Sequence, residues 1–169
     1  RPKSRCEEMT LSISRARPDQ AGLIFSLICE LAEYEKLSHE VEATEADIAA
    51  ALFGDNPRLF CEIAAWDNEP VGFAVWFFNF STFSGRSGIF LEDLFVRPAF
   101  RGKGIGKALL SNLARQSVEN GWSRVQWTVL DWNTPSIDFY KSLGAVMMDE
   151  WKLCKVSGPA LAKLAEGLP

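Results

Sequence analysis

The stretch Arg101–Leu110, RGKGIGKALL, combines three glycines with basic residues where an apolar helical pattern begins. The first turn of a helix carries unpaired N–H groups and a partial positive charge, so it can bind an anion. Glycines let the backbone approach a phosphate because no Cβ stands in the way. The stretch therefore predicts a phosphate-binding loop that consists of Arg101, Gly102, Lys103, Gly104, Ile105, Gly106 and Lys107.

Two common phosphate-binding motifs do not fit this stretch. The Walker motif fails because Arg101 and Ala108 stand where it requires a glycine and a serine or threonine. The dinucleotide fingerprint G-x-G-x-x-G fails in both registers, because lysine or leucine replaces its last glycine. The pattern that remains is Arg101-x-x-Gly104-x-Gly106.

Regular elements must position this loop, and the hydrophobic pattern predicts where they lie. Apolar runs predict strands at 11–17, 59–66, 71–80, 89–96, 125–130 and 151–156. Helical spacing and capping residues predict helices at about 18–34, 44–52, 104–120, 135–143 and 159–168. This mixture predicts an α/β (α+β) fold, with a central mixed, largely antiparallel sheet flanked by helices.

The loop and its neighbours resemble the GNAT superfamily of N-acetyltransferases. LEDLFVRPAFRGKGIGKALL places an apolar strand, a Val-Arg-Pro exit and the loop in the family's order. LDWNTPSIDFYKSLGA is similar to the family's second signature, and the resemblance extends from Leu11 to about Val156. ELAEYEKLSHEV and FLEDLFV are similar to the diamine (spermidine/spermine) and thialysine N-acetyltransferase branch.

This resemblance implies a GNAT fold in which a splay separates the central strands. It implies acetyl-CoA as the cosubstrate and direct acetyl transfer to the primary amine of a small cationic substrate. The candidates are a short diamine and an amino acid similar to lysine, ornithine or thialysine.

The amine must lose a proton, because a primary alkylamine with a pKa of about 10 is almost wholly protonated at pH 7. Glu92 interrupts the apolar run Ile89–Val96, where a charge without a purpose is costly. Strand alternation predicts that Glu92 and Asp93 face opposite sides. The resemblance implies that Glu92 is catalytic and faces the amine, with Asp93 beside the substrate. A salt-bridged or capping pair is the alternative.

The remaining chemistry requires an oxyanion site and a proton for the departing thiolate. Tyr140 can supply that proton, because a phenol keeps its proton at pH 7; the alternative is a core aromatic. Asn133 caps the predicted helix, and Ser136 lies one turn before Tyr140, so all three could line the bound CoA. The resemblance implies that backbone N–H groups meet the acetyl carbonyl and the pantetheine arm at Leu94, Phe95 and Val96.

The distal end of the amine is assigned through the resemblance. Tyr34 and Glu35 are similar to the pair that receives it in the diamine branch. The segment Ser81-Thr82-Phe83 lacks the acid followed by tryptophan of polyamine-specific members, which disfavours spermidine. Glu150 and Trp151 either close the pocket or pack as part of a strand.

Composition narrows the possible partners. A net charge of −4 and a pI near 5.1 argue against nucleic acid and suit a cationic substrate. The one histidine and four scattered cysteines show no metal-ligand spacing, so no metal site is predicted. No apolar run reaches the ~18 residues of a membrane span, and we expect a cytoplasmic protein.

The expected organisation is a disordered or vector-derived extension at residues 1–9, followed by a single domain at 10–169. A homodimer is implied by the resemblance alone. Two other functions remain open: a protein or peptide N-acetyltransferase, and a non-catalytic acyl-CoA-binding sensor. The first requires an open groove for a peptide, and the second predicts binding without turnover.

Overall fold

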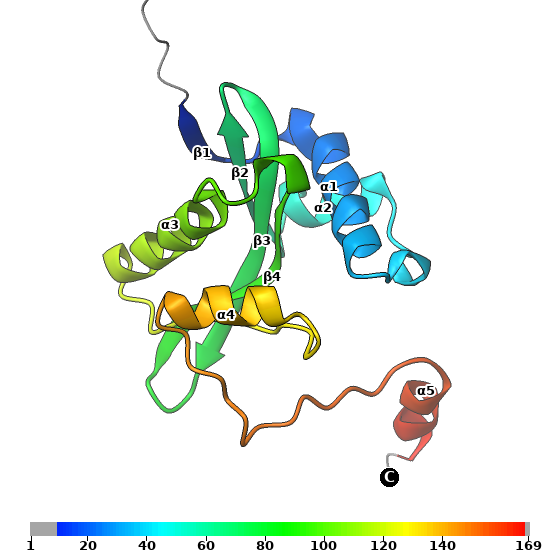
Figure 1. The fold of residues 1–169 in the computed structure, drawn as a ribbon. Helices are drawn as coiled ribbons and strands as arrows, with labels where there is room; N and C mark the ends of the chain where they lie inside the picture. The colour runs from blue at the N-terminus through cyan, green and yellow to red at the C-terminus, as the bar shows by residue number, and fades with distance from the viewer. Residues whose placement is uncertain (1–9, 168–169) are drawn as a thin grey trace, which may run out of the picture. The chain divides into compact units, whose positions relative to one another are not determined.

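The computed structural model describes residues 10–167, and the extension predicted at residues 1–9 lies outside them. The chain divides into two compact units, one ending at Thr128 and one beginning at Val129. The elements of the first unit are β1 (Leu11–Arg15), α1 (Ala21–Tyr34), α2 (Glu45–Phe53), β2 (Phe60–Trp66), β3 (Glu69–Ser81), β4 (Arg86–Val96), α3 (Ile105–Glu119) and β5 (Val125–Trp127) (Figure 1).

The first unit is built on a five-stranded mixed sheet in the order β1-β2-β3-β4-β5. The first four strands form antiparallel pairs, and β5 runs parallel to β4. A parallel pair requires a crossover connection, and α3 supplies it. The predicted mixed, largely antiparallel sheet is confirmed, although β3 and β4 extend into the segment 81–88 that the sequence predicted as a loop.

Helices cover both faces of this sheet: α1 and α2 lie on one side and α3 on the other (Figure 1). The core beneath α1 joins Ile24 and Leu27 to Phe73 and Phe95, all at most 4% exposed. The predicted cap of α2 is also present. The Thr44 hydroxyl accepts the Asp47 N–H at 3.3 Å, while the Asp47 carboxylate accepts the Thr44 N–H at 2.8 Å.

Strand β4 is irregular at the position that matters for chemistry. Val75 pairs with Asp93 but Trp76 pairs with Leu91, so Glu92 is the extra residue of a β-bulge. Within residues 10–167, β5 pairs with β4 only along Ile89–Leu91. The pairing stops after Leu91 because β5 ends at Trp127, so Glu92–Val96 has no β5 partner among the described residues, and the splay itself stays a prediction.

The second unit holds α4 (Thr134–Ser142) and α5 (Gly158–Glu166). The Asn133 side chain accepts the Ser136 N–H at 3.4 Å, and a proline stands in the first turn. The predicted cap of this helix is therefore confirmed. Tyr140 is buried, at 9% exposure, and its ring centroid lies 5.4 Å from that of Phe139.

The prediction of a strand at 151–156 was wrong. Within the described part of the chain this segment forms no strand, and Trp151 and Leu153 are 72% and 85% exposed. Its apolar residues favour a strand, but a strand also needs a neighbour with which to exchange backbone hydrogen bonds.

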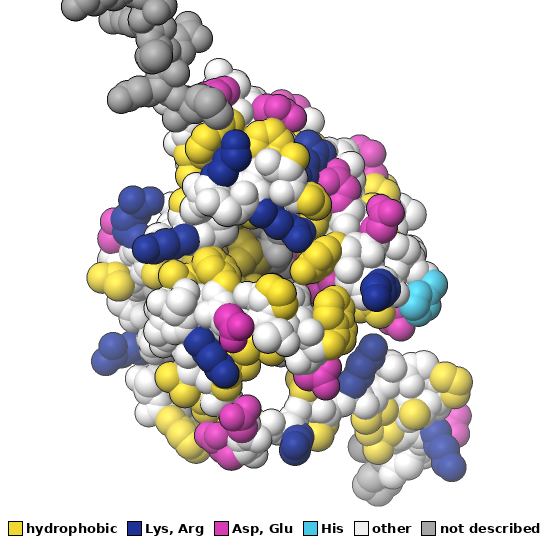
Figure 2. All heavy atoms as spheres, viewed as in Figure 1, with side chains coloured by type: hydrophobic (Ala, Val, Ile, Leu, Met, Phe, Trp, Pro, Cys, Tyr) yellow, Lys and Arg dark blue, Asp and Glu magenta, His cyan; other side chains and the backbone are white. Residues whose placement is uncertain are grey.

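The described residues show neither a membrane span nor a metal cluster. Over residues 10–167, no helix combines the length and apolar character needed to cross a membrane. The same residues contain no group of three or more His, Cys, Asp or Glu side chains that could hold a metal ion. On the face shown in Figure 2, basic and acidic side chains are intermixed rather than gathered into a patch of one sign.

Candidate active site

The glycine-rich loop has the backbone that anion binding requires. Gly102 and Gly104 have φ angles of 74° and 79°, in the left-handed region that glycine favours, and Gly104 is the N-cap of α3. A Cβ built on either glycine would have no atom within 4 Å. Space is therefore open at these two glycines, just before α3, where a ligand could approach the backbone.

We expect Gly104→Val to weaken acetyl-CoA binding at least tenfold, about 1.4 kcal/mol. The branched side chain would disfavour the left-handed conformation and fill the approach to the N–H groups. Isothermal titration calorimetry measures the change. Gly85→Val is the matched control, because Gly85 also has a positive φ, 64°, and open space around it, but lies in the β3–β4 turn. Equal affinity of the two variants would contradict binding at the loop.

Both basic residues at the start of the loop lie over aromatic rings. The Lys103 ammonium is 5.0 Å from the Trp66 ring centroid and 5.7 Å from that of Phe100. The Arg101 guanidinium carbon is 4.4 Å from the Tyr34 ring centroid. Sequence reasoning missed the rings of Trp66 and Phe100, because no local pattern indicates which distant aromatic a cation will reach.

An ion pair fixes α1 to the exit of β4. The Arg97 guanidinium donates to the Glu30 carboxylate at 2.8 and 3.0 Å and to the Pro70 carbonyl at 3.0 Å. The hydrogen bond from Arg97 lowers the pKa of Glu30. The pair is only partly exposed, and its geometry holds the C-terminal half of α1 near the loop. Tyr34 and Glu35 are thereby held close to the candidate site.

Three carboxylates predicted from the sequence lie in the first unit. Burial, then the charges of Glu92 and Glu35, raise the pKa of Asp93 to about 7. Burial also raises the pKa of Glu35. Glu92 is exposed at the bulge, whereas Asp93 is half-buried opposite Val75, a residue of the α1-side core. The charge of Glu35, which follows Tyr34 at the end of α1, reaches Asp93, so the two carboxyls can together attract a cation.

The other predicted site residues lie in the second unit. Asn133, Ser136 and Tyr140 belong to α4 or its cap. Glu150 and Trp151 lie in the exposed segment that follows α4. Because Glu92 and Tyr140 belong to different units, their joint action stays a prediction.

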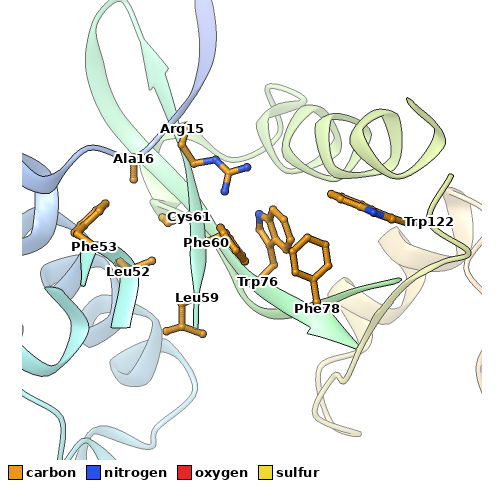
Figure 3. Close-up of a pocket in the computed structure, with 10 residues that line it drawn as sticks. All are labelled: Arg15, Ala16, Leu52, Phe53, Leu59, Phe60, Cys61, Trp76, Phe78 and Trp122. Carbon is orange, nitrogen blue, oxygen red and sulfur yellow. The ribbon is translucent and has the colours of Figure 1, made fainter. Parts of the chain in front are cut away.

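A cavity of about 400 Å³ lies elsewhere in the first unit, and no residue predicted for the site lines it. Figure 3 shows Arg15 above Phe60 and Trp76, with Phe78 and Trp122 beside them. The Arg15 guanidinium lies 3.2 Å from the Glu62 carboxylate and donates to the Gln116 side chain at 3.2 Å. Arg15 is the one charged residue that lines the cavity, and Glu62 and Gln116 already bind its guanidinium. We therefore interpret the cavity as a packing feature of the sheet.

Comparison with known proteins identifies the family. The model described as "Acetyltransferase (GNAT) family" matches residues 24–145. A thialysine N-epsilon-acetyltransferase of Bos taurus is 39% identical over 164 residues, covering 90% of this chain and 96% of that protein. The chain belongs to the GNAT family of acetyltransferases. It is an N-acetyltransferase, and the matched residues include the loop, Glu92 and Tyr140.

Two further similarities of this acetyltransferase are informative. An L-ornithine N5-acetyltransferase of Arabidopsis thaliana is 30% identical over 194 residues, covering 88% of this chain and 85% of that protein. The solved structure of an integron cassette protein from the mobile metagenome of V. cholerae is similar with a TM-score of 0.78 and 29% identity, covering 94% of this chain and 99% of that one. The acetyltransferase therefore matches these proteins over most of their length.

Proposed function

We propose that this acetyltransferase transfers acetyl from acetyl-CoA directly to the primary amine of a small cationic substrate. The candidate substrates are amino acids similar to lysine, ornithine or thialysine, and short diamines. The observation that carries the proposal is the loop before α3, with its left-handed Gly102 and Gly104, in the same unit as the carboxyls of Glu92, Asp93 and Glu35. The names of the thialysine and ornithine acetyltransferases support the same substrate class.

Different residues of the chain serve the separate steps of acetyl transfer. The loop residues 101–107 and the start of α3 bind the pyrophosphate through backbone N–H groups. Those N–H groups of Leu94–Val96 that point away from β3, along the edge that β5 does not pair, meet the pantetheine arm and stabilise the oxyanion. Glu92 accepts the proton of the amine, and the Tyr140 hydroxyl protonates the departing thiolate.

A thiol-release assay with acetyl-CoA and a panel of amines tests the proposal. We expect lysine, ornithine, thialysine or short diamines to give a higher kcat/KM than spermidine and simple monoamines. If spermidine is preferred clearly, or monoamines react equally well, the assigned amine site is wrong. Acetylation of peptides instead would indicate a protein acetyltransferase, and acetyl-CoA binding without turnover would indicate a sensor.

Glu35→Gln should reduce the preference for a dication over a monoamine about tenfold, because it removes the charge that binds the second cation. Coulomb attraction across a partly buried cleft is worth a few kcal/mol before desolvation, roughly 4 kcal/mol at contact with an effective ε of about 20. The ratio of kcat/KM for a diamine and a monoamine of equal length measures the effect. Glu33→Gln, on the exposed side of α1, is the matched control. An unchanged ratio in Glu35→Gln would remove this residue from the site.

A further inference from the structure

Two side-chain contacts join the C-terminal half of α1 to the segment that leads from β4 into the loop. The Glu30 carboxylate accepts hydrogen bonds from the Arg97 guanidinium at 2.8 and 3.0 Å. One helical turn later, the Tyr34 ring centroid lies 4.4 Å from the guanidinium carbon of Arg101. Residues four apart on a helix share one face, and here each contacts one of two arginines that are also four apart in the sequence. This face of α1 is therefore held in one register against the segment 97–101.

Arg97 is itself fixed on the sheet. Its backbone N–H donates to the Val71 carbonyl at 2.8 Å, and its Nη1 donates to the Pro70 carbonyl at 3.0 Å. The pair with Glu30 is partly buried, so salt screens it less than a pair on the open surface. The guanidinium therefore gives α1 an anchor whose position is set by β3 and by the exit of β4.

The apolar contacts of α1 leave its position less closely defined. Leu27 and Leu31 are buried in the core, but hydrophobic burial has no preferred direction, and packed helices can slide by small amounts. A guanidinium that binds both oxygens of a carboxylate fixes the distance and the orientation of its partner. The placement of α1 along the sheet therefore depends on Glu30, and the place of Glu35, at the end of the same helix, depends on it too.

We propose that Glu30 and Arg97 are positioning residues, which hold the end of α1 so that Glu35 can receive the cationic amine opposite the carboxyls of β4. This inference rests on the proposed function, because it takes Glu35 as part of the amine site. Glu30 and Arg97 act through Glu35 and have no contact with the substrate themselves. The end of α1 is close enough to β4 for the charge of Glu35 to reach Asp93.

The pair should affect binding of the amine and not binding of acetyl-CoA. The segment before the loop has hydrogen bonds that do not involve α1. The Phe100 N–H donates to the Arg97 carbonyl at 2.9 Å, and the Arg101 Nε donates to the Val96 carbonyl at 2.9 Å. Loss of the Glu30 charge leaves these bonds in place, so the loop should keep its affinity for acetyl-CoA when the end of α1 is released.

The experiment compares Glu30→Gln and Arg97→Gln with the wild type in steady-state kinetics with thialysine. Each variant should raise the KM for the amine about tenfold, while kcat and the Kd for acetyl-CoA measured by calorimetry change less than twofold. The double variant should be no worse than either single variant, because the two residues act as a pair. Arg97→Lys should recover part of the loss, since an ammonium keeps the charge without the planar fork. Asp19→Asn, which removes an exposed ion pair just before α1, should leave all three constants unchanged.

The pH dependence provides a readout that a loss of stability alone would not change. Burial and the charges of Glu92 and Glu35 raise the pKa of Asp93 to about 7 in the wild type. Release of the end of α1 withdraws the Glu35 charge from Asp93, which lowers that pKa. The midpoint of the rise in kcat/KM should therefore move to lower pH in Glu30→Gln.

Three results would overturn the inference. A wild-type KM for the amine and an unchanged pH midpoint in Glu30→Gln would show that Glu35 is held without the pair, while the acetyltransferase function stands. Equal weakening of amine and acetyl-CoA binding, together with a lowered Tm, would make the pair a general support of the fold. If the wild-type enzyme acetylates neither thialysine nor any other amine of the panel, the proposed function fails and the inference fails with it.

Discussion

Tyr140→Phe is expected to lower the turnover number for acetyl transfer about 100-fold, within the usual effect of a lost general acid. The variant keeps the buried ring that packs near Phe139 in α4, so the fold should be maintained. It removes the hydroxyl that we propose as the proton donor to the departing thiolate. Steady-state kinetics measure kcat, and calorimetry should show nearly unchanged affinity for acetyl-CoA.

The second tyrosine of the chain provides a matched control. Tyr34→Phe also deletes one phenolic hydroxyl, but Tyr34 lies at the end of α1 under the Arg101 guanidinium. We expect it to change the KM for the amine by at most a few-fold and to leave kcat nearly intact. Wild-type turnover in Tyr140→Phe would show that solvent or another group protonates the thiolate.

Asp93→Asn is expected to reduce kcat/KM for the amine about 100-fold above pH 7 and to change its pH dependence. The pKa of Asp93 is raised to about 7, chiefly by burial, so the carboxyl is neutral below that pH and charged above it. Wild-type kcat/KM should therefore rise as the pH passes through about 7. Asp93→Asn should lose this rise relative to the wild type, whereas Glu92→Gln should keep it with a lower kcat.

Although Asp93→Asn should lower activity, it should increase the stability of the folded protein above pH 7. The pKa of the Asp93 carboxyl in the folded protein is raised above the ordinary value of 3.8. The protonated form is therefore favoured by folding, and stability is lost as the pH rises from about 4 through about 7. Above pH 7 the variant should be more stable than the wild type by about 1–3 kcal/mol, allowing for solvent around a half-buried group. Equal stability at pH 8 would indicate an ordinary pKa for Asp93.

Local features of this chain were predictable from its sequence. The Thr44 cap, the Asn133 cap and the left-handed Gly104 before α3 each depend on residues within one or two turns of helix. The strand order β2-β3-β4 also follows from short connections and apolar runs. Such features are predictable because the residues that determine them are neighbours in the chain.

Features that depend on pairing between distant residues were not predictable. The bulge at Glu92 arises from the register of β4 against β3, and it breaks the simple alternation expected for Glu92 and Asp93. The raised pKa of Asp93 depends on burial and on Glu35, which is distant in the sequence. The contact of Arg101 with Tyr34 likewise brings together residues that are distant in the sequence, because the long Arg101 side chain extends to the end of α1. The segment 151–156 has the residues of a strand but no neighbouring strand to pair with, and it forms no strand.

Mass spectrometry of a reaction quenched during turnover tests direct acetyl transfer most simply. The wild-type enzyme, acetyl-CoA and thialysine should give thialysine acetylated on its side-chain nitrogen, in an amount equal to the thiol released. The intact protein should carry no acetyl group, because the proposed mechanism uses Glu92 and Tyr140 as base and acid rather than as nucleophiles. An acetylated protein that accumulates and then decays, or thiol release without acetylated thialysine, would contradict direct transfer to the amine.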